Sequence, residues 1–291
     1  MNIESKILLE NAVMHDAIAD YHNLNVPYIN RQSTKLFYQK IILEHFDRKS
    51  KPERPIRVLE LGCGTGTFVE MFAQNNFSYV GVDLSERMIE ISKINFRGRN
   101  NVEFFCTDLK SFSSTSIDKF DLIVSSSFLH HLHDLEDGLV DISNLLNKTG
   151  VYVGLHEPIV PHKQSFFNKI DTIFAMFIGS YFGQYNFLIR AILVICGYFN
   201  LDKMGERSNW FDIFQFYSYL KNGKLRNAKA EEVNYVDFQL NNDFDLSNRT
   251  FSEIIDSKIE IVKYNFSVFS LIRKLDFSNP NYTALILKKA E

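Results

Sequence analysis

The sequence is poor in cysteine, and its few cysteines lie far apart. Cys63, Cys106 and Cys196 are odd in number, and none of them belongs to a C-x-x-C pair. Isolated cysteines provide neither a disulfide framework nor the ligand spacing of a zinc site. We therefore expect no metal centre. Because Cys63 and Cys106 each adjoin an apolar run, we interpret both as small residues that pack in the interior.

The chain also lacks a block of basic residues. It has 32 Lys and Arg against 35 Asp and Glu, which gives a net charge of −3. Sequence-independent binding to nucleic acid depends on clustered lysine and arginine, so nucleic acid is not an expected partner. The first residues show no signal-peptide pattern, and we expect a cytoplasmic protein.

No uninterrupted apolar run reaches the length of a membrane span. Residues 172–189 carry no Asp, Glu, Lys or Arg, but Gly179, Ser180, Gly183 and Asn186 interrupt them. A transmembrane helix needs about 20 mainly apolar residues. We therefore do not expect this segment to span a membrane.

What the sequence does contain is a glycine-rich turn between an apolar run and a helix pattern. The run over residues 57–61 ends at Gly62, and Gly64 and Gly66 follow before the helix pattern starts at Phe68. Glycine lets a ligand approach the backbone closely, and a helix N-terminus presents unpaired N–H groups. The turn therefore predicts a site for a small polar ligand.

Two common nucleotide-binding patterns do not fit this turn. The dinucleotide fingerprint G-x-G-x-x-G would need a third glycine where Thr67 stands. The P-loop would need a lysine followed by serine or threonine after the glycines, and this pair is missing. The distinctive neighbour of the turn is an acid, Glu60, two residues before Gly62.

Further apolar strand patterns along the chain also end in polar residues. Residues 79–82 run into Asp83, and residues 102–106 are followed by Asp108. Strands that alternate with helices imply a parallel sheet with right-handed crossovers. Ligands of such sheets lie beyond the carboxyl ends of the strands. The other strand patterns cover residues 120–124, 150–155, 259–264 and 282–287.

The acid, the three glycines, Asp83 and Asp108 together resemble the class I S-adenosyl-L-methionine (SAM)-dependent methyltransferases. The resemblance covers about residues 40–158 and the C-terminal strands. It is closest to the broad group that includes ubiquinone/menaquinone C-methyltransferases and many small-molecule O- and N-methyltransferases. It implies an α/β, Rossmann-like fold: a seven-stranded, mostly parallel sheet with an antiparallel last strand and helices on both faces. It also implies SAM as cofactor and a small, hydrophobic acceptor that is methylated on O, N or C.

The resemblance also assigns the residues that contact the cofactor. It implies that Glu60 supports the amino group of SAM, that Asp83 binds the ribose and that Asp108 binds the adenine. A structural role, such as helix capping, is the alternative for the aspartates. The full predicted set is Glu60, Gly62, Cys63, Gly64, Gly66, Asp83, Leu84, Asp108, Leu109 and Ser125.

Candidate catalytic residues follow the fourth and fifth strand patterns. Methyl transfer from a sulfonium mainly needs geometry and the exclusion of water, but an oxygen or nitrogen acceptor can need a base, and histidine suits neutral pH. His130 stands at a place similar to that of the base histidine in plant-type O-methyltransferases. Those enzymes have His-Asp-Trp where this chain has His-His-Leu. His131 and Glu157 are further candidates, and packing or capping of the next helix is the alternative for the histidines.

The resemblance divides the chain into four parts. Residues 1–50 are expected to form a helical cap, residues 51–158 the SAM-binding core and residues 258–291 the strands that complete the sheet. We expect the aromatic-rich residues 159–257 to form a helical insertion between the fifth and sixth strands, and we interpret this insertion as a lid over the acceptor. Packing, dimerisation and contact with a membrane surface are its alternatives. Two other functions stay open: a catalytically silent binding protein and a protein-directed methyltransferase.

Overall fold

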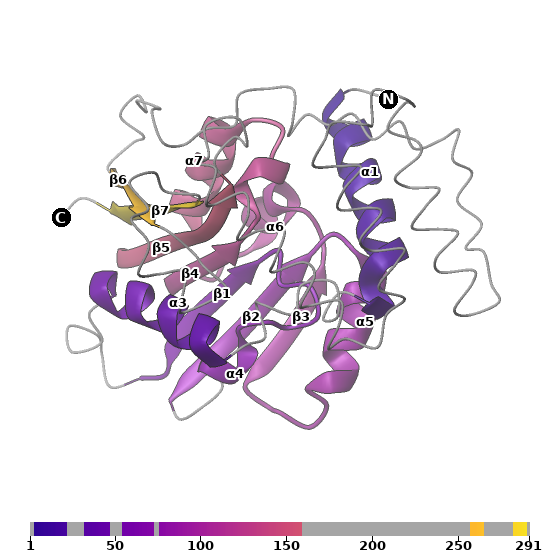
Figure 1. Ribbon diagram of the computed structural model, residues 1–291, viewed down its shortest axis with the longest axis horizontal. Helices are drawn as coiled ribbons and strands as arrows, with labels where there is room; N and C mark the ends of the chain where they lie inside the picture. The colour runs from indigo at the N-terminus through magenta and orange to yellow at the C-terminus, as the bar shows by residue number, and fades with distance from the viewer. Residues whose placement is uncertain are drawn as a thin grey trace, which may run out of the picture.

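A seven-stranded sheet forms the centre of the protein (Figure 1). The computed structural model describes residues 3–21, 32–46, 54–72, 76–158, 257–264 and 282–289. The strands stand in the order β3-β2-β1-β4-β5-β7-β6, which confirms the α/β fold predicted from the sequence. Their bounds are Ile56–Leu61 (β1), Phe77–Asp83 (β2), Val102–Cys106 (β3), Phe120–Ser126 (β4), Leu146–Pro158 (β5), Ser257–Tyr264 (β6) and Tyr282–Lys289 (β7).

The strand directions locate the place where a ligand is expected. Strands β1 to β5 pair in parallel, whereas β7 runs antiparallel to both β5 and β6. The strand order reverses beside β1, which pairs with β2 on one side and with β4 on the other. The register sets Leu61 opposite both Val82 and Ser125. The carboxyl ends of these three strands therefore lie side by side at the switch point of the sheet.

Helices cover both faces of the sheet, and each face has its own apolar core (Figure 1). Val58 and Val124 belong to the core that includes α3 and α4, whereas Leu59 and Ile123 belong to the core that includes α6 and α7. Adjacent strand residues point to opposite faces, so one strand supplies both cores. The helices are α1 Ile3–Ile18, η1 Ala19–Tyr21, α3 Gln32–His45, α4 Val69–Phe72, α5 Glu86–Asn95, α6 Leu109–Thr115, η3 Leu129–His131 and α7 Leu135–Leu145.

The edge position of β3 overturns one expectation. Cys106, the last residue of β3, is exposed, although the sequence suggested an interior position. Strand β3 pairs with a single neighbour, β2, and only Phe104 among its residues is buried. Cys63, by contrast, is buried as expected.

The N-terminal region is helical where the structure describes it. Helix α1 stands beside α5, away from the centre of the sheet (Figure 1).

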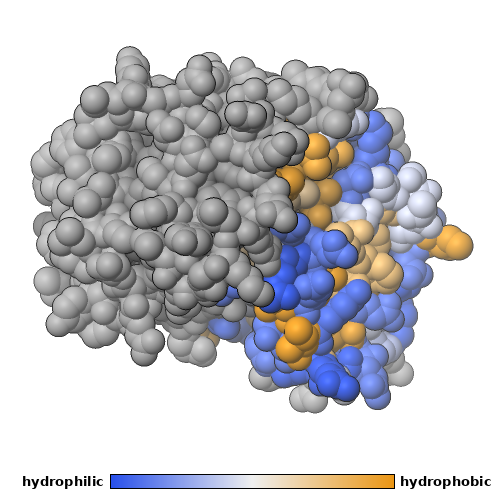
Figure 2. All heavy atoms as spheres, turned by 90° about the vertical axis from the view of Figure 1, so that its right-hand side faces the viewer, coloured by the Kyte–Doolittle hydropathy of each residue, from blue (hydrophilic) through white to orange (hydrophobic). Residues whose placement is uncertain are grey.

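In the described part of the face shown in Figure 2, hydrophilic residues predominate and hydrophobic ones form separate areas. None of the helices in the described ranges is long and apolar enough to cross a membrane. The expected insertion over residues 159–257 lies outside the described residues except for Ser257, and the boundaries of the four parts stay predictions.

Candidate functional site

A cavity of about 720 Å³ lies at the carboxyl ends of β1, β2 and β4. This is the position expected for a ligand of a parallel sheet, beside the strand where the order reverses. Helix α1 supplies another part of its wall. The lining includes Glu60, Gly62 and Gly64 around the glycine turn; Asp83 and Leu84 at the end of β2; Thr107, Asp108 and Leu109 after β3; Ser126, Ser127, Phe128 and His131 around the end of β4; and Leu8, Asn11 and His15 of α1.

The glycine turn adopts a backbone that glycine takes far more readily than other residues. The φ angles of Gly62, Gly64 and Gly66 are +63°, +52° and +90°, in the left-handed region. Gly62 and Gly64 line the cavity, whereas Gly66 is not among the lining residues. A Cβ on Gly66 would lie 2.4 Å from Cε2 of Phe96, at the end of α5. The lack of a side chain at Gly66 therefore permits this close packing, and its contact with the cofactor stays a prediction.

Asp83 joins the glycine turn to the second strand. Its Oδ2 accepts a hydrogen bond from the backbone N–H of Gly64 at 2.8 Å, and its Oδ1 accepts one from Ser85 N at 2.9 Å. Each carboxylate oxygen has a further lone pair that can accept from a hydroxyl group. Asp83 lines the cavity, so it can both fix the turn and bind a ligand.

Glu60 is a buried carboxyl group in the cavity wall. It is 2% exposed, and its Oε2 accepts from the hydroxyl of Tyr79 and from the backbone N–H of Phe68. Burial raises the pKa of Glu60 to about 8, the two hydrogen bonds oppose this shift, and the charge of Asp83 adds to it. A positively charged group in the cavity would favour the ionised carboxylate.

Asp108 lines the cavity and also begins α6. Its Oδ1 accepts from Ser111 N at 2.9 Å and its Oδ2 from the Ser111 hydroxyl, which makes it the N-cap of the helix. The capping alternative considered for this residue is thus present in the structure, and it leaves lone pairs for a ligand. Leu84 and Leu109, the apolar neighbours of the two aspartates, line the cavity as well.

Neighbouring serines at the end of β4 differ in their surroundings. The hydroxyl of Ser125 lies 2.7 Å from that of Tyr152 in the interior, and Ser125 is absent from the cavity wall. Ser126 does line the cavity, and its buried Oγ has no hydrogen-bond partner among the described residues. Consecutive strand residues point to opposite sides, so Ser126 lines the cavity and Ser125 does not. Contact of Ser125 with the cofactor stays a prediction. Cys63 is likewise a core residue outside the wall.

His130 and Glu157 come together, but neither lines the cavity. Nδ1 of His130 lies 2.8 Å from Oε2 of Glu157. Glu157 is fully buried, and its Oε1 accepts from the backbone N–H groups of Phe128 and Leu129, each at 2.9 Å. Because these are the free N–H groups at the start of η3, Glu157 fixes this short helix.

The sequence over the sheet is similar to that of known methyltransferases. Residues 59–152 match the family described as methyltransferase domain. The ubiquinone biosynthesis O-methyltransferase of Pelagibacter ubique (strain HTCC1062) is 29% identical over 120 residues, which are 40% of this chain and 48% of that protein. The malonyl-[acyl-carrier protein] O-methyltransferase of Bacillus anthracis is 30% identical over 113 residues, 38% of this chain and 40% of that protein. The chain thus spans less than half the length of these relatives.

One solved methyltransferase structure is similar in fold to this chain. The plantazolicin methyltransferase BpumL, in complex with a monoazolic desmethylPZN analog and SAH (S-adenosylhomocysteine), has a TM-score of 0.50 at 14% identity. The likeness covers 99% of this chain and 97% of that one. The family match contains the glycine turn, Asp83 and Asp108. Residues 59–152 are thus similar in sequence to a methyltransferase domain.

The cavity of the methyltransferase domain fits SAM, the cofactor of this family. Gly62 and Gly64 line the cavity with their backbone, and Gly62 has no room for a side chain because a Cβ there would lie 2.9 Å from Cδ2 of Phe128. The buried hydroxyl of Ser126 needs a partner that a ligand can supply. The acidic Glu60 suits an amino group, and Asp83 has acceptor capacity for hydroxyl groups.

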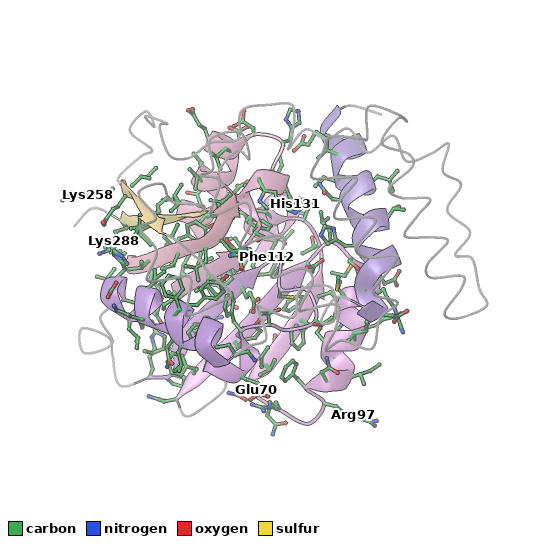
Figure 3. The ribbon with its side chains drawn as sticks, viewed as in Figure 1. Glu70, Arg97, Phe112, His131, Lys258 and Lys288 are labelled. Carbon is green, nitrogen blue, oxygen red and sulfur yellow. The ribbon has the colours of Figure 1, made fainter. Side chains whose placement is uncertain are left out.

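Helix α1 brings residues to the methyltransferase domain that the sequence did not reveal. Asn11 and His15 line the cavity together with His131. Figure 3 labels His131 in the part of the protein beside α1. Oδ1 of Asn11 lies 2.9 Å from Nδ1 of His131, and the rings of His15 and His131 meet edge to face with centroids 5.2 Å apart. The only local signal would have been the spacing of Leu8, Asn11 and His15 on one side of a helix.

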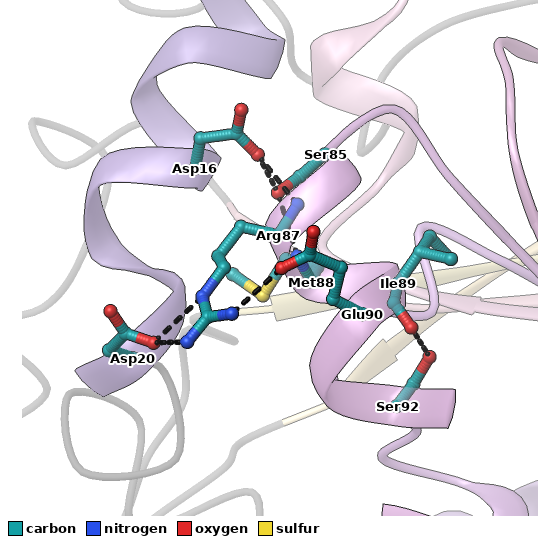
Figure 4. A network of polar contacts seen from close by, with 8 residues as sticks. All are labelled: Asp16, Asp20, Ser85, Arg87, Met88, Ile89, Glu90 and Ser92. Carbon is teal, nitrogen blue, oxygen red and sulfur yellow. Dashed lines mark hydrogen bonds and ion pairs between the residues drawn. The ribbon is translucent and has the colours of Figure 1, made fainter. Parts of the chain in front are cut away.

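Asp16 of α1 and Asp20 of η1, which directly follows α1, bind residues at the start of α5 (Figure 4). Oδ1 of Asp16 accepts from the hydroxyl of Ser85 and from the backbone N–H of Arg87, the latter at 3.0 Å. Oδ1 of Asp20 accepts from Nε and Nη2 of Arg87 at 3.0 and 2.8 Å. Since Ser85 follows the ribose candidate Asp83 by two residues, the position of α1 is tied to the cofactor end of β2.

Proposed function

We propose that the chain is an enzyme that transfers a methyl group from SAM to a small, hydrophobic acceptor. One observation carries this proposal: a single cavity is lined both by the cofactor candidates and by apolar residues from elements outside the glycine turn. These apolar residues are Leu8 of α1, Leu132 after η3 and Val140 of α7. Adjacent binding of two ligands in one cavity is what in-line transfer needs.

The chain's own residues would bind and orient the cofactor. When bound, SAM supplies a methyl group on a positively charged sulfur. The carboxylate of Glu60 would pair with the amino group, Asp83 would accept from the ribose hydroxyls and Asp108 from the adenine amino group. Gly62 and Gly64 let the ligand approach the backbone, and the apolar wall excludes water from the transferred group.

The histidine roles follow from which residues reach the cavity. His130 and Glu157 do not line the cavity, and Glu157 binds the backbone at the start of η3. We therefore infer that both are positioning residues. His131 is the residue of this trio that lines the cavity. A base at this site would therefore be His131, which lies beside Asn11 and His15 of α1.

Calorimetry with SAH tests the cofactor part of the proposal. We expect Asp83→Asn to weaken binding about 10- to 100-fold, because it removes charge-assisted acceptors of two ribose hydroxyls. The matched control is Asp118→Asn, an exposed aspartate paired with Arg57 outside the cavity wall, which should bind SAH as the unmodified protein does. Absence of SAH binding to the unmodified protein would contradict the proposal.

The acceptor can be found by mass spectrometry with isotope-labelled SAM and a panel of small hydrophobic hydroxyl, amine and carbon acceptors. Labelled product supports an enzyme that acts on small molecules. SAH binding without any labelled product would favour the catalytically silent alternative, and label on added proteins alone would favour a protein-directed methyltransferase.

A further inference from the structure

Phe128, between β4 and η3, lies against the glycine turn. It lines the cavity, and its Cδ2 and Cγ stand 2.9 and 3.6 Å from the position of a Cβ on Gly62. The ring is therefore in contact with the first glycine of the turn. Gly62 is two residues from Glu60 and two residues from Gly64, whose N–H binds Asp83 at 2.8 Å. Phe128 thus adjoins the stretch between the two acids proposed for the ends of the cofactor.

The covalent structure of SAM indicates what would lie at this stretch. The sulfur of SAM joins the amino-acid part to the ribose. If the amino group pairs with Glu60 and the ribose binds Asp83, the sulfur passes Gly62. Among the described lining residues Phe128 alone has a benzene ring. A benzene ring attracts a cation electrostatically over its face, and the sulfur of SAM is positively charged.

The backbone around Phe128 is held by three hydrogen bonds to β5. The N–H of Phe128 donates to Oε1 of Glu157 at 2.9 Å. Ser127 has a φ angle of +54°; its N–H donates to the carbonyl of Leu155 at 2.9 Å and its hydroxyl to that of His156 at 3.1 Å. A residue with a side chain keeps this left-handed backbone only where its surroundings enforce it. The place of Phe128 is therefore fixed before a ligand binds.

The charges of the cavity wall also favour a cation. Seven acidic side chains line the cavity against one lysine, Lys110, among the described lining residues. Lys110 forms an ion pair with Glu4, another lining residue, at 3.1 Å. A cavity lined mainly by one sign of charge attracts ligands of the other sign. The wall and the ring thus act in the same direction on a positively charged ligand.

We propose that the ring of Phe128 binds the sulfonium group of SAM, and that the cavity thereby distinguishes SAM from SAH by charge. This inference rests on the proposed methyltransferase function and adds a residue that recognises the state of the cofactor. Methyl transfer leaves the electron pair of the C–S bond on sulfur, so SAH is neutral at this atom. The attraction to the ring is then lost, which favours replacement of SAH by SAM.

Calorimetry with the full chain tests this role by comparing three ligands. They are SAM, SAH and sinefungin, a SAM analogue in which an amine-bearing carbon replaces the methylated sulfur. We expect Phe128→Leu to weaken the binding of SAM and sinefungin about 2- to 30-fold more than that of SAH, the range of a cation–ring contact. Phe105→Leu is the matched control, because Phe105 of β3 is exposed and outside the cavity wall. It should leave all three affinities unchanged.

A second replacement keeps the shape of the ring and changes only its electrons. In place of Phe128, 3,4,5-trifluorophenylalanine has an electron-poor face and should shift the ratio of the SAM and SAH dissociation constants in the same direction as Phe128→Leu. The proposal requires both replacements to shift this ratio, and an unchanged ratio in either one overturns it. Absence of SAM and SAH binding to the unmodified protein would instead mean that the proposed function itself has failed.

Discussion

Glu60 is a carboxyl group that holds its proton more tightly in the folded protein than in the unfolded chain. An acid of this kind favours folding below its raised pKa, and stability is lost as the pH rises between the two pKa values. For Glu60 the window runs from about 4.5 to about 8. Within this window the ionisation of Glu60 lowers the free energy of unfolding by up to about 1.4 kcal/mol per pH unit, and the variant Glu60→Gln should lack this contribution. Urea denaturation of the SAH-free protein at pH 5.5, 6.5 and 7.5 measures the free energy of unfolding of both proteins.

Asp118→Asn is the control for this slope. Its ion pair with Arg57 lowers the pKa of Asp118 below the ordinary value, so its contribution is present above that value and is lost only in more acidic solution. Between pH 5.5 and 7.5 the control should follow the unmodified protein. If the free energy of unfolding of Glu60→Gln fell with pH as steeply as that of the unmodified protein, Glu60 would not be the cause of the decline.

The cofactor residues differ in how far sequence reasoning could reach them. Glu60, Gly62 and Asp83 are local signals, because a strand end and a glycine turn fix their positions within a few residues. Ser125 and Ser126 could not be told apart, since the face to which a strand residue points depends on the register of the sheet. Asn11 left only its helical spacing with Leu8 and His15 as a signal, because its contact with His131 joins residues 120 positions apart.

At the scale of elements, α1 is held to α5 by a small number of polar contacts. Asp16→Ala removes the acceptor of Ser85 Oγ and Arg87 N at the start of α5. The free energy of unfolding should fall by about 1–2 kcal/mol, as it does when a helix-capping contact is lost. Because α1 also lines the cavity, we expect weaker SAH binding together with faster hydrogen exchange in α1. Calorimetry and exchange mass spectrometry measure the two effects.

Lys110→Met is the matched control for the helix contact, since Lys110 also joins α1 to the core, through Glu4. That ion pair is exposed, and exposed pairs contribute little because solvent screens them. Exchange in α1 should be nearly unchanged in this variant. Equal effects of the two substitutions would mean that the Asp16 contact is no stronger than a surface pair.

At the scale of the whole molecule, the cavity connects parts of the chain that are remote in sequence. Its wall contains α1, the glycine turn and the segments after β2, β3 and β4. A ligand that binds only the folded protein stabilises it by about 2.7 kcal/mol at a concentration 100 times its dissociation constant. SAH should thus raise the melting temperature, and hydrogen exchange should slow in α1 and the glycine turn at the same ligand concentration.

The edge formed by β6 and β7 is the internal reference for this exchange experiment. None of its described residues lines the cavity, so its local exchange should respond to SAH less than that of α1. Protection of the glycine turn with none in α1 would mean that SAH binds without the helix. In that case the residues that α1 adds to the cavity would not contact SAH, and Asp16→Ala would leave the affinity for SAH unchanged.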